Sequence, residues 1–170
     1  AQDNLMILWD LETKEFIRKL SRHNGAVTDV AFHPDGTMAV SASGDSTLIL
    51  WDLDTGQPIH VLDHGNSDVL SVAFSPDGSL LLSSSRDERL LLWDVESGEV
   101  ISTFETTGQA AGHDLKVNSI AFGPNGLYAI TASDDTNLII WDIATATARY
   151  SLKGNSDKVL SVAIDANDQF

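Results

Sequence analysis

The Trp-Asp dipeptide occurs four times in this chain, each time at the end of a short apolar run. The tryptophans are Trp9, Trp51, Trp93 and Trp141, so that successive copies are 42, 42 and 48 residues apart. A fixed period in this range is typical of repeat architectures, in which each unit buries its apolar faces only against its neighbours. The chain must therefore be interpreted repeat by repeat.

Each repeat holds short runs rich in Val, Leu and Ile, bounded by clusters of Gly, Pro, Asp and Asn. Such runs predict β-strands, and turns such as HPDG place Pro early and Gly late, where tight turns favour them. No segment has a helical period. The predicted strands are 27–32, 38–43, 48–52 and 58–62, then 69–74, 80–85, 90–94 and 99–104, then 117–122, 128–133, 138–142 and 148–152, with a last first strand at 159–164.

Four antiparallel strands in a unit of about 42 residues form a β-propeller blade. The chain resembles WD-repeat β-propeller proteins through its period, its Trp-Asp ends, an Asp six residues before each Trp and a partial Gly-His signal. The resemblance extends over essentially the whole chain. It implies an all-β fold of four-stranded antiparallel blades that form an incomplete ring, and the regular turns resemble those of bacterial members.

The repeats are out of register with the two ends of the sequence. We expect residues 1–20 to end one blade and residues 153–170 to start another, with blades at 21–62, 63–104 and 105–152, the last containing a six-residue insertion. Propellers of this kind commonly close with about seven or eight blades. We therefore expect a segment of a longer propeller or, alternatively, two chains that join in one ring. In both cases a single chain forms an open arc of blades. Its exposed strand edges and apolar faces favour self-association.

One repeat contains Ser41, His23 and Asp45, the residue types of a hydrolytic triad. These positions recur in other repeats, whereas a catalytic set is needed once. A buried Trp needs an acceptor for its indole N–H, and a hydroxyl can accept this bond and donate onward. The resemblance implies such a structural network, running from Trp through a hydroxyl and His to Asp. Its expected members are His23, Ser41, Asp45, Trp51, Ser83, Asp87, Trp93, His113, Thr131, Asp135 and Trp141.

Two features of this network stay open from spacing alone. The rival hydroxyls are Ser43, Ser85 and Ser133. In the repeat at 63–104 the order is His64-Gly65, so Gly65 takes the histidine position, and Asn155 takes it in the last partial repeat. A water or His64 must then serve Asp87, because glycine offers no side-chain hydrogen bond. We expect this blade to be the softest of the complete ones.

The sequence contains no pattern that predicts an active site, a cofactor or a metal centre. The stretch DLDTG at 52–56 has the start of a calcium loop but lacks the later ligands and the closing Glu. The five histidines lack metal-ligand spacing, there is no cysteine, and no Gly-rich phosphate loop is present. We therefore expect no enzyme, no catalytic residue, no cofactor and no metal.

The chain has 25 acidic and 10 basic residues and a formal net charge of -15. This field repels nucleic acid and anionic lipid, and no apolar run reaches transmembrane length, so neither partner is expected. We expect a cytoplasmic, non-enzymatic scaffold that binds other proteins or peptides. The alternative function is a regulatory or sensor module of a larger signalling or nucleotide-hydrolysing protein. The remaining blades of a longer propeller are a further expected partner.

Recognition is expected where the repeats differ from one another. In propellers of this family, the loops that lead into each first strand share one face with the turns between second and third strands, and the differences concentrate there. The insertion TTGQAA at 106–111 is either a tolerated loop extension or a partner contact. The expected partner-binding residues are Gly44, Asp68, Arg86, Thr106, Thr107, Gln109, Lys116, Asp134 and Lys158.

Overall fold

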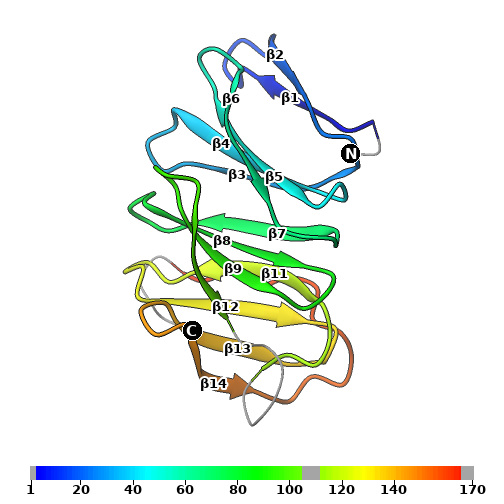
Figure 1. Ribbon diagram of the computed structural model, residues 1–170, viewed down its shortest axis with the longest axis vertical. Helices are drawn as coiled ribbons and strands as arrows, with labels where there is room; N and C mark the ends of the chain where they lie inside the picture. Colours follow the sequence, from blue (N-terminus) through cyan, green and yellow to red (C-terminus); the bar gives the residue numbers. More distant parts are fainter. Residues whose placement is uncertain (1–2, 105–111, 166–170) are drawn as a thin grey trace.

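The computed structural model describes residues 3–104 and 112–165, and within these ranges the chain forms fourteen β-strands and no helix (Figure 1). Three sheets are four-stranded and one is two-stranded, all antiparallel. The all-β class and the four-stranded blades are thus confirmed, and the described residues form no closed ring. They also contain no helix that is long and apolar enough to cross a membrane.

The strands follow one another in sequence order within each sheet. The N-terminal hairpin consists of β1 (Leu5–Trp9) and β2 (Phe16–Ser21). Blade 1 consists of β3 (Val27–Phe32), β4 (Met38–Ser43), β5 (Thr47–Asp52) and β6 (Pro58–Asp63). Blade 2 consists of β7 (Val69–Phe74), β8 (Leu80–Ser85), β9 (Leu90–Asp94) and β10 (Val100–Phe104). Blade 3 consists of β11 (Val117–Phe122), β12 (Tyr128–Ser133), β13 (Leu138–Asp142) and β14 (Thr147–Leu152).

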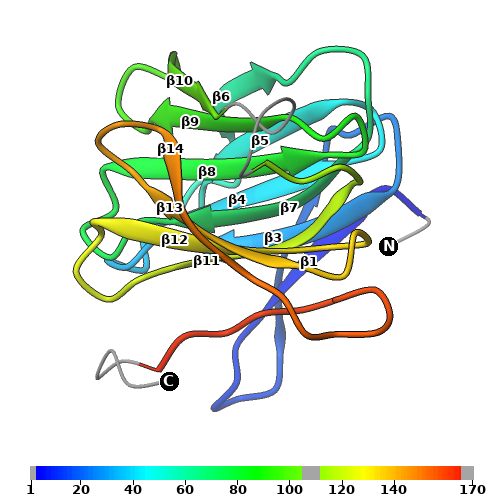
Figure 2. The same cartoon turned by 90° about the horizontal axis from the view of Figure 1, so that it is seen from below.

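The core lies between the sheets, which are stacked one upon the next in Figure 1. Figure 2 shows the same stack from below. The second strand of one blade packs on the first strand of the next, as β4 does on β7 and β8 on β11. One apolar cluster joins blades 1 and 2 through Val40, Leu50 and Trp93. A second cluster joins blades 2 and 3 through Leu82 and Trp141. Each sheet therefore buries its faces only against its neighbours, as repeat architectures require.

The N-terminal side of the arc is open. Phe32 on β3 is 60% exposed, whereas Phe74, at the same position on β7, is 9% exposed. The difference arises because β4 covers β7, whereas among the described residues only the two-stranded hairpin precedes β3. Trp9 on this hairpin is 53% exposed, in contrast to Trp51 at 2%.

The prediction of a strand at 159–164 is wrong, because the structure assigns none there. A strand needs a partner, and within the described ranges no second strand pairs with this segment. It is held instead along blade 3 by hydrogen bonds, two of which its own backbone N–H groups donate. The Val159 N–H donates to the Ser133 carbonyl at 2.9 Å, and the Val162 N–H donates to Ser119 Oγ at 3.3 Å.

The exposure of Trp9 predicts an uneven fluorescence quenching of the four tryptophans. Acrylamide should quench one tryptophan readily and the other three weakly, because Trp51, Trp93 and Trp141 are at most 3% exposed. Trp9→Phe should abolish the readily quenched fraction, whereas the control Trp93→Phe should retain it. Stern–Volmer curves of the wild type and both variants check this expectation. Readily quenched emission that persists in Trp9→Phe would contradict the exposure of the hairpin.

Candidate functional site

A chain of hydrogen bonds links four elements of blade 1. The Trp51 Nε1–H donates to Ser41 Oγ at 2.9 Å, and the same oxygen lies 2.7 Å from His23 Nε2. His23 Nδ1 lies 2.9 Å from Asp45 Oδ2. Because a carboxylate only accepts, Nδ1–H donates to Asp45, and in the neutral imidazole Nε2 accepts the Ser41 hydroxyl proton. This network connects the loop before β3 with β4, β5 and the β4–β5 turn.

Blade 3 repeats this arrangement with threonine in place of serine. The Trp141 Nε1–H donates to Thr131 Oγ1 at 2.7 Å, and Thr131 Oγ1 lies 2.7 Å from His113 Nε2. His113 Nδ1 lies 2.7 Å from Asp135 Oδ2. Burial lowers the pKa of His113 against the opposing effect of Asp135, so the neutral imidazole that this chain of bonds requires is favoured.

The aspartates that end these networks stay ionised. Burial raises the pKa of Asp45, but hydrogen bonds from Thr47, the Asn24 N–H and His23 outweigh it and lower the pKa to about 2. Burial also raises the pKa of Asp135, but hydrogen bonds from the Asn137 N–H and His113 outweigh it, so the pKa is lowered overall. Each carboxylate is therefore a fixed negative acceptor that holds a turn and a loop together.

The rival hydroxyls serve the turns. Ser43 Oγ accepts from the Asp45 N–H at 3.1 Å, and Ser133 Oγ accepts from the Asp135 N–H at 3.1 Å. They lie on the same strand face as Ser41 and Thr131, two residues further along. Position along the strand, rather than the face, thus decides which hydroxyl meets the indole.

The Ser41, His23 and Asp45 set presents no reachable nucleophile. Ser41 is fully buried at 0% exposure, and its oxygen already contacts the Trp51 indole and the imidazole. A hydrolytic serine must instead reach a substrate carbonyl. In the part of the chain that the structure describes, no group of three or more His, Asp or Glu side chains could hold a metal ion.

Blade 2 lacks the link from histidine to aspartate. The Trp93 Nε1–H donates to Ser83 Oγ at 2.8 Å, and the His64 ring lies 6.1 Å from the Trp93 ring. His64 is 2% exposed, burial lowers its pKa, and its Nε2 has no hydrogen-bond partner among the described residues. Asp87 accepts from the Ser85 hydroxyl, so a rival hydroxyl serves the carboxylate that we expected His64 or a water to serve.

Arg89 ties the blade 2 loop to the turn in a different way. Its guanidinium Nη1 donates to the His64 carbonyl at 3.1 Å. A Cβ atom at Gly65, where φ is +123°, would lie 2.6 Å from this nitrogen, so glycine leaves the room that the arginine occupies. The corresponding turn positions hold Thr47 and Asn137, and this difference is the sequence signal for the changed contact.

We call the surface formed by the loops before each first strand and the turns between second and third strands the loop face. One backbone hydrogen bond recurs on this face in all three blades. It joins the turn residue before the Asp that recurs in each repeat to the last loop residue before the first strand. The pairs are Gly44 N–H to the Ala26 carbonyl at 2.9 Å, Arg86 N–H to the Asp68 carbonyl at 2.9 Å, and Asp134 N–H to the Lys116 carbonyl at 3.2 Å.

Ion pairs cover two of these contacts. The Arg86 guanidinium lies 3.4 Å from the Asp68 carboxylate. Asp134 Oδ2 lies 2.8 Å from Lys158 Nζ and 3.6 Å from Lys116 Nζ. The hydrogen bond from Lys158 is the main cause of the lowered pKa of Asp134, and that carboxylate in turn raises the pKa of Lys158.

The expected partner-binding residues are thus only partly placed. The structure brings Asp68 beside Arg86, and Lys116 and Lys158 beside Asp134, whereas Thr106, Thr107 and Gln109 lie outside the described residues. Sequence reasoning missed Asn118, whose Nδ2 donates to Asp134 Oδ1 at 2.8 Å and to the Val159 carbonyl at 3.0 Å. The sequence signal that could have identified Asn118 is its amide side chain, because the corresponding positions of the other blades hold Thr28 and Leu70.

Comparison with known proteins agrees with this geometry. The chain matches the family described as WD domain, G-beta repeat, over residues 14–52, 56–94 and 98–142. These three segments make up more than half of its length, and the chain belongs to this family of WD-repeat proteins. WD40 repeats generally support protein–protein interaction, which is the general function that membership indicates.

Two human relatives are similar to this chain over a stretch about as long as one repeat. The U5 small nuclear ribonucleoprotein 40 kDa protein is 38% identical over 45 residues, which cover 26% of this chain and 13% of the relative. WD repeat-containing protein 37 is 38% identical over 47 residues, which cover 28% of this chain and 10% of the relative. The alignments thus span only about a tenth of the length of each relative.

His113 and His64 form a matched pair for measuring the network. Both rings are almost fully buried and face a tryptophan at 6.3 and 6.1 Å, but only His113 links a hydroxyl to an aspartate. His113→Ala should therefore lower the free energy of unfolding by about 1–3 kcal/mol more than His64→Ala, because it leaves buried polar partners unpaired. Urea unfolding of the two variants checks this difference. Equal losses would show that ring packing, rather than the hydrogen bonds, stabilises the blade.

The lowered pKa of His113 predicts a loss of stability in mild acid. The unfolded chain takes up this proton near the ordinary pKa of 6.5, whereas the folded chain takes it up only at lower pH, so stability is full above 6.5 and falls as the pH drops below it. His64 acts in the same direction. The urea midpoint of the wild type should thus be lower at pH 5 than at pH 7.5, and His113→Gln should show a smaller drop. An identical drop in this variant would rule out His113 as a source.

Proposed function

We propose that the chain is a non-enzymatic scaffold that binds other proteins or peptides through its loop face. One observation carries the proposal: the same backbone hydrogen bond places two variable positions side by side in every blade. The tryptophan and the hydroxyl residue of the network beneath these positions vary little between repeats. The paired positions change from Ala26 with Gly44 to Asp68 with Arg86 and Lys116 with Asp134. Variation on a rigid base is what a recognition surface needs.

Rigidity comes from the networks directly beneath this surface. His23 and His113 bond to an aspartate in the adjacent turn, so loop and turn are held in one geometry before a partner arrives. A preorganised surface loses less conformational entropy on binding, and more of the contact energy appears as affinity. The name of the U5 small nuclear ribonucleoprotein 40 kDa protein places that relative in an assembly, which agrees with a scaffold role.

The charges of the loop face indicate what a partner presents there. The side chains of Arg86, Lys158 and Lys116 are 64%, 57% and 37% exposed, whereas that of Asp134 is only 8% exposed. The two lysines therefore reach solvent while the carboxylate that they share does not, and Arg86 reaches solvent beside the Asp68 carboxylate, which is 40% exposed. Acidic residues, among them Asp68, Asp114 and Asp157, are also exposed on this face, so its charge is mixed. The three exposed cations can each pair with a carboxylate from outside, and the proposed partner is a protein that contributes acidic side chains.

Charge reversal at Arg86 tests this proposal. Arg86→Glu should lower the recovery of an endogenous partner by about fivefold or more, as expected when a contacting charge worth about 1 kcal/mol is lost, without changing Tm. Affinity capture followed by quantification of the recovered protein is the measurement. Arg149→Glu is the matched control, because Arg149 also forms an exposed ion pair, with Asp142, at the opposite end of the strands. Equal recovery with Arg86→Glu and wild type would place recognition elsewhere.

A further inference from the structure

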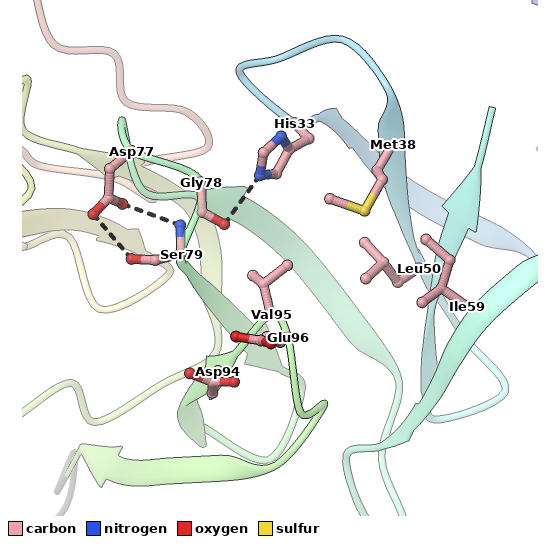
Figure 3. A pocket seen from close by; sticks show the side chains of 10 residues that line it. All are labelled: His33, Met38, Leu50, Ile59, Asp77, Gly78, Ser79, Asp94, Val95 and Glu96. Atoms are coloured by element: carbon pink, nitrogen blue, oxygen red, sulfur yellow. Dashed lines mark hydrogen bonds between the residues drawn. The ribbon is translucent and has the colours of Figure 1, made fainter. Parts of the chain in front are cut away.

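A pocket of about 420 Å³ opens between blades 1 and 2 (Figure 3). It lies at the end of the strands opposite the loop face, because its turns join first to second and third to fourth strands. One wall is apolar and comes from blade 1, through Met38, Leu50 and Ile59. The other wall comes from blade 2, with Val95 between polar residues. Its volume falls in the range of ligand pockets, about 300–1,000 Å³.

Three acidic residues of blade 2 line the same pocket: Asp77, Asp94 and Glu96. Among the described residues none of the three forms an ion pair, in contrast to Asp68, Asp134 and Asp142. Three carboxylates without an ion pair thus border a pocket whose other wall is apolar, although that of Asp77 turns toward Ser79 and away from this wall (Figure 3). No element of the proposed loop-face interaction involves these residues.

We propose that this pocket binds a basic side chain, arginine or lysine, presented by a peptide segment of a protein partner. Both side chains carry an aliphatic stem that packs on apolar surface and a cationic head that needs acceptors. Met38, Leu50 and Ile59 provide the apolar surface for the stem, and the carboxylates of blade 2 provide the acceptors for the cationic head. Charge-assisted hydrogen bonds to carboxylates are about twice as strong as neutral ones.

The walls are fixed by bonds within the turns. His33 Nε2 lies 3.2 Å from the Gly78 carbonyl, and its ring packs edge-on against Phe74 at 5.1 Å, which holds the two blades together at the mouth (Figure 3). Asp77 accepts from Ser79 N–H and Oγ at 3.1 and 2.9 Å. Hydrogen bonds from serines lower the pKa of Asp77 and of Asp94, so both stay ionised at neutral pH.

The interface between blades 2 and 3 carries a neutral version of this acidic wall. By the 48-residue offset of that repeat, Asn125 stands at the position of Asp77 and Ala144 at the position of Glu96. Asp94 corresponds to Asp142, whose carboxylate is already paired with Arg149. Blade 1 carries acids at the same three positions, Asp35, Asp52 and Asp54, so blade 3 is the blade that departs from the acidic pattern, and the chain itself shows which neutral residues the fold accepts there.

The probe is a fluorescein-labelled, capped peptide with one central arginine between Gly and Ala residues, titrated into the full chain at low salt by fluorescence anisotropy. Identical peptides with lysine or with citrulline, which keeps the shape of arginine without its charge, complete the set. Saturable binding is expected for arginine and lysine, with citrulline weaker by about tenfold or more, which corresponds to about 1.4 kcal/mol. Citrulline binding as tight as arginine, or no binding of either basic peptide, would overturn the proposal.

Two double variants separate the pocket from the general field of an acidic protein. Asp77→Asn with Glu96→Ala installs the residues of blade 3 and should weaken the arginine peptide by about tenfold or more with an unchanged Tm. Glu12→Ala with Asp157→Asn removes the same two charges from exposed sites away from the pocket and should leave binding nearly unchanged. Equal weakening by both variants, or none by the first, would overturn the proposal. The citrulline comparison needs no variant, so it can overturn the proposal even if a variant fails to fold.

Discussion

The indole N–H to hydroxyl hydrogen bond is the contact on which the rest of this structure depends. Trp51, Trp93 and Trp141 lie between sheets, where their large rings fill the space that one blade offers the next. A buried N–H without an acceptor costs about 1–3 kcal/mol, so each ring can occupy this space only if the second strand supplies a hydroxyl. Ser41, Ser83 and Thr131 supply it, which fixes the third strand against the second.

Blade 2 shows that the network has two separable parts. The bond from Trp93 to Ser83 is kept at 2.8 Å although the link from histidine to aspartate is absent. Packing between blades therefore needs only the first part. The histidine link holds the loop to the turn. In blade 2 the Arg89 guanidinium makes part of this connection through the His64 carbonyl, in the space that glycine leaves at position 65. Packing between blades and loop geometry thus depend on different bonds.

Local features of the sequence predict most of this fold. The 42-residue period and the Pro and Gly turns are sufficient for the blade strands, because each pairs with a neighbour in its own repeat. The segment 159–164 has the same pattern but no strand, since its partner does not lie in the described residues. Contacts made by long side chains across blades, such as Asn118 with the Val159 carbonyl, depend on three-dimensional placement that spacing does not encode. The inter-blade pocket escaped prediction for the same reason, because each of its turns looks like an ordinary solvated turn.

The two ends of the blades can change independently of each other. Substituting Asn125 for an aspartate and Ala144 for a glutamate, as blade 3 does relative to blade 2, leaves the strand pairing of the blade intact. At the other end, the backbone bond of the loop face persists whether its residues are small, as Gly44 is, or charged, as Arg86 is. Distant sites without shared partners contribute nearly additively to stability. A repeat built this way can therefore acquire exposed cations at one end and an acidic pocket at the other without either altering the tryptophan contact between them.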